Sequence, residues 1–160
     1  MNRKIRYGVF ETNSSSCHSF SYGKTFNNIY VSDVDNCVHT ELGEFGWEID
    51  VHRESATKLA YILLAAASFT GHSFWYFGDK DFNEMVESFK ETEEYKRIED
   101  AVKVYTNCAG IVIENGIEGY IDHQSLGHNS FDDWLNSTGA KNIEDFIFGN
   151  IVLRTDNDNY

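Results

Sequence analysis

The side chains best suited to chemistry gather in one polar segment near the start of the chain, residues 11–18, which reads Glu-Thr-Asn-Ser-Ser-Ser-Cys-His. Serine and cysteine become nucleophiles when a neighbouring base takes their proton, and a carboxylate beside a histidine holds that base in place. The enzyme interpretation therefore makes one of Ser14–Ser16, or Cys17, the nucleophile, with Ser15 as the named candidate, His18 as the general base and Glu11 as the group that orients the base.

Other interpretations of this segment stay open. Cys17 and His18 point to opposite sides if the chain is extended, and the Gly-x-Ser-x-Gly pattern of a nucleophile elbow is missing. The same hydroxyl and amide groups can bind local backbone atoms in a polar turn. They can also form a ligand loop, with Asn13, Ser14 and Ser16 supplying donors and acceptors. The alternatives are thus a polar turn, a ligand loop and a nucleophile.

A second polar segment, residues 119–130, places a carboxylate, two histidines, two amides and two serine hydroxyls at the end of a predicted strand and directly after it. Functional groups often lie where strands end. Asp122 and His123 would therefore join the catalytic set, and Gln124 and Ser125 the ligand loop. The spacing of the two histidines matches no zinc motif, and the chain has neither a P-loop nor a Gly-x-Gly-x-x-Gly motif. We expect no metal site and no cofactor.

The chain is strongly acidic, with a formal net charge of −13 over 160 residues. Residues 1–30 carry four basic side chains against one acidic one, so the remaining 130, with nine basic and 25 acidic side chains, carry −16. A field of that sign repels phosphates and attracts basic protein surfaces. The charge therefore disfavours direct binding to nucleic acid and favours a partner protein with a basic surface, unless it serves only to keep the chain in solution.

No segment of the chain predicts a membrane or secretory destination. The longest apolar run, Leu59–Ala67, covers nine residues, whereas a bilayer span needs about 20. The basic start is followed by too short an apolar stretch for a signal peptide. Three cysteines without a Cys-x-x-Cys pair favour reduced thiols over disulfides or structural zinc. We expect a cytoplasmic protein, within the host cell if a phage encodes it, that binds no membrane.

Hydrophobic patterns predict strands at both ends of the chain. Short apolar or alternating runs predict strands over residues 5–10, 18–22, 28–32, 45–51, 73–77 and 150–155. The pair Asn115-Gly116 lies between two further alternating runs and is the strongest short signal for a hairpin. Residues 110–114 and 118–122 are therefore predicted to pair with each other.

Helices are predicted between these strands. Ser55 is a plausible N-cap of a helix over Ala56–Phe69 that is apolar almost all round, which is typical of a buried helix packed on a sheet. Further helices are expected within 79–105, 130–136 and 142–148. Together the elements predict a single α+β domain over residues 1–160, with a mostly antiparallel sheet, helices packed on one face, and a frayed tail at 156–160.

The stretch from Asp79 to Tyr105 is the predicted docking surface. Apolar residues recur there with a period of 3.6 and indicate two amphipathic helices, or one bent helix, with acidic residues on the solvent face. Such a face steers association with a basic partner, and neighbouring aromatic residues supply affinity. The predicted partner-binding residues are Glu84, Glu87, Glu91, Glu94, Glu99 and Asp100.

Two motifs resemble those of a known group of proteins. Residues 8–16, Gly-Val-Phe-Glu-Thr-Asn-Ser-Ser-Ser, followed by His18-Ser19, resemble a signature of uncharacterised small proteins from phages and prophage-like regions of bacterial genomes. Residues 119–125 resemble a second segment of that group. In the group threonine often precedes the histidine, whereas this chain has Cys17. The resemblance implies a viral or mobile-element origin and two polar segments that meet in space, and it implies no particular reaction.

Three functions follow from these observations. The first is a phage-type binding protein, an inhibitor of the anti-defence or anti-CRISPR kind, whose acidic helices occupy the basic nucleic-acid groove of a host protein. The second is a small hydrolase or nucleotide-binding enzyme that uses the two polar segments. The third is a phage structural component that assembles with itself. The sequence favours a binding protein over an enzyme and leaves the oligomeric state open.

Overall fold

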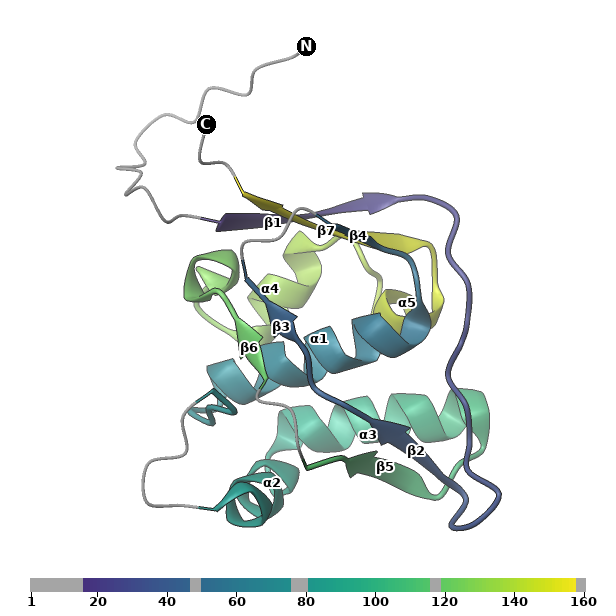
Figure 1. Cartoon of the computed structure of the whole chain (residues 1–160). Coiled ribbons are helices and arrows are strands. Elements are labelled where there is room, and N and C mark those ends of the chain that lie inside the picture. Colours follow the sequence, from purple (N-terminus) through teal and green to yellow (C-terminus); the bar gives the residue numbers. More distant parts are fainter. Residues whose placement is uncertain (1–15, 47–49, 76–80, 116–118, 158–160) are drawn as a thin grey trace.

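The computed structural model describes residues 16–46, 50–75, 81–115 and 119–157, which form a single compact α+β unit (Figure 1). The helices are α1 Ser55–Phe69, α2 Phe82–Lys90, α3 Glu93–Thr106, α4 Phe131–Ser137 and α5 Ile143–Phe148, with a 3-10 helix η1 at His123–Leu126. The strands are β1 Ser16–Tyr22, β2 Cys37–Thr40, β3 Glu44–Phe45, β4 Asp50–His52, β5 Gly110–Ile113, β6 Tyr120–Ile121 and β7 Ile151–Asn157.

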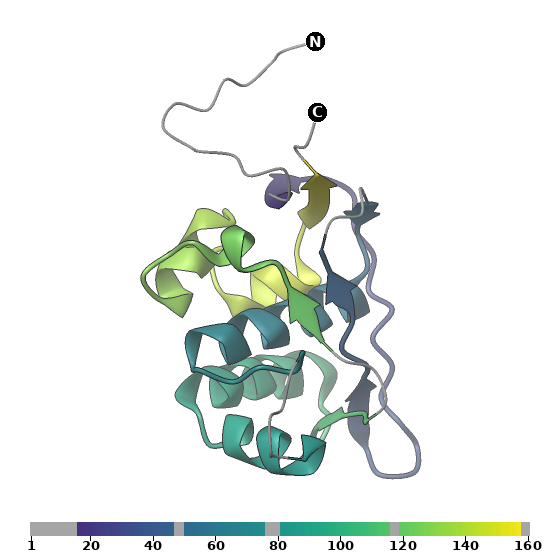
Figure 2. The same ribbon diagram turned by 60° about the vertical axis from the view of Figure 1, so that its left-hand side comes forward.

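Helix α1 lies at the centre of the fold because most of its length carries no polar face. Every residue from Leu59 to Ala67 is buried, and neighbouring elements contact the helix on all sides. In Figures 1 and 2 the three-stranded sheet lies on one side of α1, and α2 and α3 lie on the other. This confirms the prediction of a buried helix packed on a sheet, with Glu54 rather than Ser55 at its N-cap.

The three-stranded sheet has the order β1–β7–β4 and is antiparallel. Strand β7 is the middle strand, and it pairs with β1 over the full length of both, from Ser16 opposite Asn157 to Tyr22 opposite Ile151. Helices α1, α4 and α5 lie beneath this sheet (Figure 1). The predicted antiparallel sheet with helices beneath it is therefore present, but it is smaller than expected.

The inner face of this sheet is fixed to the helices by an aromatic cluster. The ring of Phe20, on β1, lies 6.1, 6.0 and 5.9 Å from the rings of Tyr61, Trp134 and Phe146. The first two contacts are close to perpendicular, an arrangement that places a ring edge against a ring face and adds about 0.5–1.5 kcal/mol each to the gain from burial. One strand residue thus connects β1 to α1, α4 and α5.

The remaining strands form two parallel pairs, and the predicted hairpin was wrong. Strand β5 pairs with β2, and β6 pairs with β3, in parallel and not with each other. Three of the four residues of β5 are buried, which is typical of a strand covered on both faces by crossover helices. The Asn-Gly pair favours a local turn, but the two strands that flank it pair instead with β2 and β3, which come from an earlier part of the chain.

Other strand predictions had mixed outcomes. The predicted strand at 45–51 is divided between β3 and β4, which belong to different sheets. Residues 28–32 contribute only an isolated bridge between Val31 and Val38, and Ser73–Trp75 is not a strand. Strand β2 was not predicted. Residues 5–10 lie outside the described residues, as do 158–160 of the predicted tail, whereas β7 extends to Asn157.

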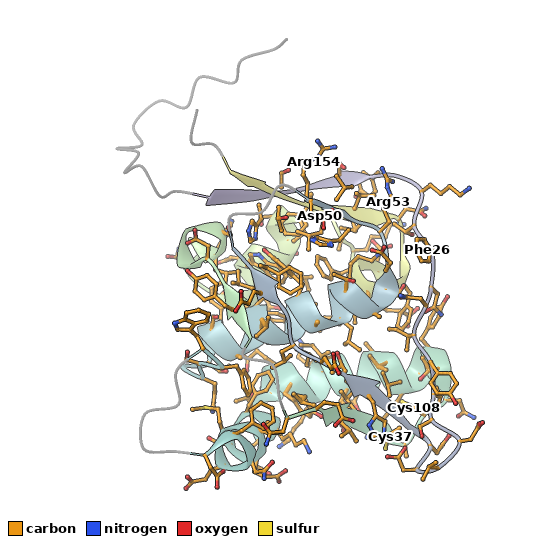
Figure 3. All side chains as sticks on the ribbon, in the orientation of Figure 1. Phe26, Cys37, Asp50, Arg53, Cys108 and Arg154 are labelled. Atoms are coloured by element: carbon orange, nitrogen blue, oxygen red, sulfur yellow. The ribbon has the colours of Figure 1, made fainter. Side chains whose placement is uncertain are left out.

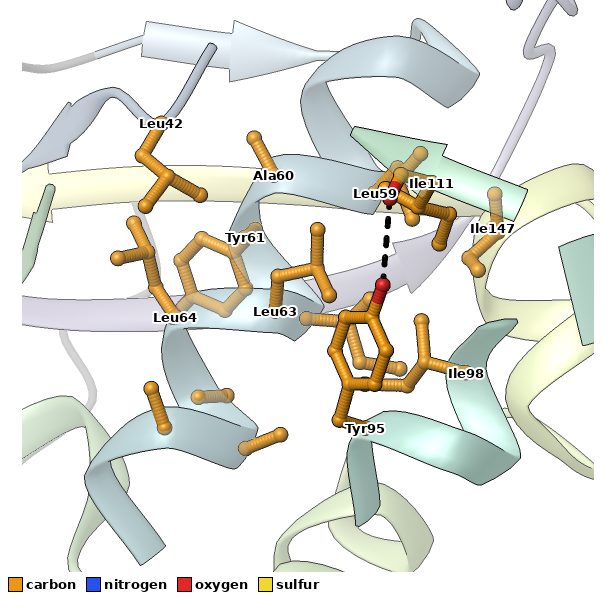
Figure 4. Packing of buried hydrophobic residues seen from close by; sticks show 14 of the residues in the cluster. Leu42, Leu59, Ala60, Tyr61, Leu63, Leu64, Tyr95, Ile98, Ile111 and Ile147 are labelled. Atoms are coloured by element: carbon orange, nitrogen blue, oxygen red, sulfur yellow. Dashed lines mark hydrogen bonds between the residues drawn. The ribbon is translucent and has the colours of Figure 1, made fainter. Parts of the chain in front are cut away.

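The helices outside the core begin where capping side chains occur. Each of these helices begins with a side chain that accepts a hydrogen bond from a backbone N–H of the first turn. These side chains are Asp81 for α2, Thr92 for α3, Ser130 for α4 and Asn142 for α5. The cap at Thr92 separates α2 from α3, so the acidic stretch forms two helices. Helix α3 packs under β5, and the hydroxyl oxygen of its Tyr95 lies 3.3 Å from the backbone oxygen of Ile111 (Figure 4). Among the described residues no helix is long and apolar enough to cross a membrane.

Candidate functional site

The described parts of the two polar segments meet at His18. Strand β1 runs beside η1, and the backbone N–H of His18 donates to Oγ of Ser125 over 3.3 Å. Asp122 lies directly before η1 and is 2% exposed, while Ser125 is 9% exposed. Three residues predicted for the enzyme or ligand site are therefore brought into one buried region.

The ring of His18 is buried, and both of its nitrogens are engaged. Nε2 lies 3.1 Å from the backbone oxygen of Gly46, and Nδ1 lies 2.7 Å from the hydroxyl of Tyr61. A carbonyl oxygen only accepts, so Nε2 carries a proton and, in the neutral ring, Nδ1 accepts the Tyr61 proton. The bond to Ser125 comes from the backbone and not from the ring. The geometry therefore makes His18 a structural link between β1 and α1.

Seven predicted site residues lie outside the described part of the structure, either wholly or by their side chains: Glu11, Asn13, Ser14, Ser15, Ser16, His123 and Gln124. The catalytic arrangement of Glu11, Ser15 and His18 consequently stays a prediction. So does the ligand loop.

The acidic residues of α2 are exposed, as the docking hypothesis requires. Glu84, Glu87 and Glu91 lie opposite the buried stripe that packs on α3 and the core. Glu87 lies 3.4 Å from Lys90, and Glu91 lies 3.8 Å from a lysine of α3. Exposed pairs of this kind contribute little free energy, so the carboxylates remain available to a partner.

The acidic residues of α3 are less uniform. Asp100 is exposed and Glu94 half-buried, but Glu99 accepts hydrogen bonds from the Tyr95 hydroxyl at 2.9 Å, from Lys103 Nζ at 3.0 Å and from the Ile111 backbone N–H at 3.3 Å. Burial acts to raise the pKa of the Glu99 carboxyl, but these hydrogen bonds outweigh it and hold the pKa below its usual range. Glu99 thus ties α3 to β5.

A groove beside β2 and β3 is a feature that the sequence analysis missed. Two adjoining hollows of about 310 and 330 Å³ share His39, Thr40 and Ala56. Helix α1 forms the floor, β2 and β3 form one side, and the connection at residues 28–32 forms the other. We call this the β2 groove. Its lining residues are Asn28, Ile29, Tyr30, Ser32, Val38, His39, Thr40, Glu41, Gly43, Phe45, Ala56, Thr57, Leu59 and Ala60.

His39 lines both hollows of this groove, and its ring lies between two carboxylates. Its Nε2 lies 2.7 Å from Oδ2 of Asp35, and its Nδ1 contacts the carboxylate of Glu114, the residue directly after β5. The hydrogen bonds that the ring donates to Glu114, which has the larger effect, and to Asp35 raise the pKa of His39 above its usual value. With an acceptor at each nitrogen, the ring is best satisfied as an imidazolium. Asp35 lies four residues before His39, but no spacing could have identified Glu114.

Lys58 is a second feature that the sequence analysis missed. The side chain is fully buried, and Nζ donates to the backbone oxygen of Gly149 over 3.0 Å. The hydroxyl of Thr25 donates to the same oxygen over 2.8 Å. Burial lowers the pKa of Lys58 to about 8, against an opposing effect of Asp145. Lys58 lines neither hollow of the β2 groove, so we assign it to the core and not to a site.

The residues that the structure describes include no group of three or more histidine, cysteine, aspartate or glutamate side chains arranged to hold a metal. Cys37 and Cys108, labelled in Figure 3, are free thiols. Comparison with protein-family models, curated proteins and solved structures found no match to this chain.

Proposed function

We propose that this chain is a phage-type binding protein whose acidic surface occupies a basic groove of a host protein, one that normally holds nucleic acid. The observation that carries the proposal is the position of the charge. The carboxylates of α2 are exposed and share one face, whereas the described histidine–serine cluster is buried and internally hydrogen-bonded. A surface that mimics the charge of phosphates competes with nucleic acid for the same basic groove.

The enzyme alternative has weaker support. It needs His18 as a base with a nitrogen within hydrogen-bond reach of a nucleophile. Among the described residues the two ring nitrogens contact Gly46 and Tyr61, and neither of the two hollows of the β2 groove is lined by His18, Asp122 or Ser125. An inhibitor requires no such pocket.

The test begins with capture of the partner from host lysate and measures how fast the purified partner associates. Replacing Glu87 and Glu91 with lysine changes the net charge by +4 on the outer face of α2. The matched control, Asp133→Lys with Glu144→Lys, makes the same change on α4 and α5. We expect association at low salt to slow by about tenfold or more for the α2 variant and far less for the control, with the difference vanishing at high salt.

Competition supplies the second measurement. A nucleic acid that binds the captured partner should be displaced by the wild-type protein and by the control, and much less by the α2 variant. If association is insensitive both to salt and to the α2 substitutions, or if nucleic acid and this chain bind the partner together, the proposal is wrong.

A further inference from the structure

The outer edge of β2 and β3 is only partly covered. The backbone oxygens of Gly43 and Phe45 accept from Tyr120 and Asp122, so the backbone groups of Glu44, between them, face away from β6. On this side the described residues pair with β2 through the isolated bridge between Val31 and Val38 and the 2.8 Å hydrogen bond from the Ser32 N–H to the backbone oxygen of Cys37, which leaves the edge at Glu44 of β3 open among the described residues. An edge of this kind can accept an added strand.

The β2 groove lies along this edge and has an apolar floor. Ala56, Leu59 and Ala60 of α1 form the floor, and both hollows open beside Thr40. Tyr30 lines the outer side and is 69% exposed. Phe26, which precedes this connection and is labelled in Figure 3, is 54% exposed. Exposed aromatic residues beside an apolar hollow are typical anchors of protein interfaces.

The residues beside this groove are acidic. The described residues among 28–57 carry six acidic side chains against Arg53 and the imidazolium of His39, a balance of −4 that equals the balance of residues 81–106, which carry eight acidic and four basic side chains. Glu41 lines the groove, and Glu44 is exposed on the open edge. The occupant that complements this rim is positively charged.

We propose that the β2 groove binds an extended basic segment of the partner protein. The segment adds a strand along the edge at Glu44, sets an apolar side chain on the alanine floor, and places lysine or arginine side chains beside Glu41 and Glu44. This inference rests on the proposed function, to which it adds a second contact surface and the conformation of the partner segment. Main-chain hydrogen bonds between the added strand and the edge supply affinity, and the acidic rim favours a positively charged segment over a negatively charged one.

The probe is a fluorescently labelled peptide of alternating lysine and valine, capped at both ends, and binding is measured by fluorescence anisotropy. One control peptide carries glutamate in place of lysine. A second keeps the lysines but is N-methylated at every other backbone nitrogen, which removes strand pairing and leaves the charge. We expect the lysine peptide to bind, the glutamate peptide not to bind, and the methylated peptide to bind about tenfold more weakly or worse.

Protein variants locate the site. Ala56→Arg fills the floor shared by both hollows and adds a positive charge, while Ser68→Arg makes the same addition at an exposed position near the other end of α1. We expect Ala56→Arg to weaken peptide binding about tenfold or more and Ser68→Arg to leave it almost unchanged. The double substitution of Glu41→Lys and Glu44→Lys changes two exposed residues at the rim. We expect it to weaken peptide binding by about the same factor without filling the floor of the groove.

The inference is wrong if the wild-type protein binds none of the peptides, if the methylated peptide binds as well as its parent, or if Ala56→Arg and Ser68→Arg behave alike. The captured partner separates this failure from failure of the proposed function. Partner binding that depends on the α2 carboxylates but not on the groove variants retains the function and rejects the groove. If the peptide binds in the groove but binding of the captured partner is insensitive to salt and to substitution of every acidic residue, the groove is retained and the proposed function is rejected.

Discussion

Replacing Lys58 with methionine should change how the stability of this protein depends on pH. The lysine is fully buried, and burial lowers its pKa from 10.5 to about 8. The unfolded chain therefore keeps its proton up to about pH 10.5, while the native protein releases it near pH 8. Between these values the unfolded state binds more protons, so the free energy of unfolding of the wild type rises with pH.

The size of the effect follows from the difference between the two pKa values. Each pKa unit corresponds to about 1.4 kcal/mol, so the wild type gains about 3 kcal/mol relative to Lys58→Met between pH 7 and pH 10.5. Methionine has no such dependence and fills a similar volume. Near pH 7, where the buried charge costs most, the variant should be at least as stable as the wild type, even though Gly149 keeps only the hydroxyl of Thr25.

Urea unfolding followed by tryptophan fluorescence at several pH values between 7 and 10 measures this difference. The control is Lys141→Met, because Lys141 is exposed and its loss should leave the pH dependence of the wild type unchanged. Parallel curves for the wild type and Lys58→Met would refute the reasoning. So would a wild type that loses stability relative to the variant as the pH rises.

Three further substitutions test contacts of the site and its supports. His39→Gln removes an imidazolium whose raised pKa stabilises the native state, an effect fully present below pH 6.5. The stability of the wild type relative to the variant should therefore fall as the pH rises through the raised pKa. Urea midpoints measured from pH 5 to 9 test this. Glu99→Gln weakens the tie between α3 and β5 and should cost about 1–2 kcal/mol at pH 7, with the deficit shrinking as acid protonates the wild-type carboxyl; an unchanged urea midpoint at pH 7 contradicts this. Tyr61→Phe leaves Nδ1 of buried His18 without the Tyr61 hydroxyl and should cost about 1–3 kcal/mol, checked by thermal unfolding against the exposed control Tyr30→Phe, which should cost almost nothing.

The helices could be predicted from the sequence because their signals are local. Helix α1 is apolar on every side, and the capping side chains of α2 to α5 stand directly before the apolar stripes that they start. The strands could not be paired in the same way. Strands β2 and β5 are separated by three helices along the chain, and the four residues of β2 show no alternation that distinguishes them from a loop. Parallel pairing is decided by which surfaces the helices leave uncovered.

The candidate site was predicted only in part, for the same reason. The motif resemblance led to the expectation that His18 and Ser125 lie in segments that meet, and the described residues do meet. It gave no indication that Tyr61 and Gly46 hold the histidine ring, because both come from elements without sequence proximity to either segment. Lys58 looks like a solvent-facing residue near the start of a helix, and its burial depends on α5 and on Gly149 at the end of that helix, which come from a distant part of the chain.

The middle position of β7 has a consequence for how the protein is made. During synthesis β1 and β4 leave the ribosome long before the strand that must lie between them. Until β7 emerges, both carry open edges, and the aromatic side chain of Phe20 has no completed sheet to hold it over the helices. Folding of the three-stranded sheet therefore waits for residues 151–157, and until they emerge the open edges of β1 and β4 are accessible to chaperones or to strands of other chains.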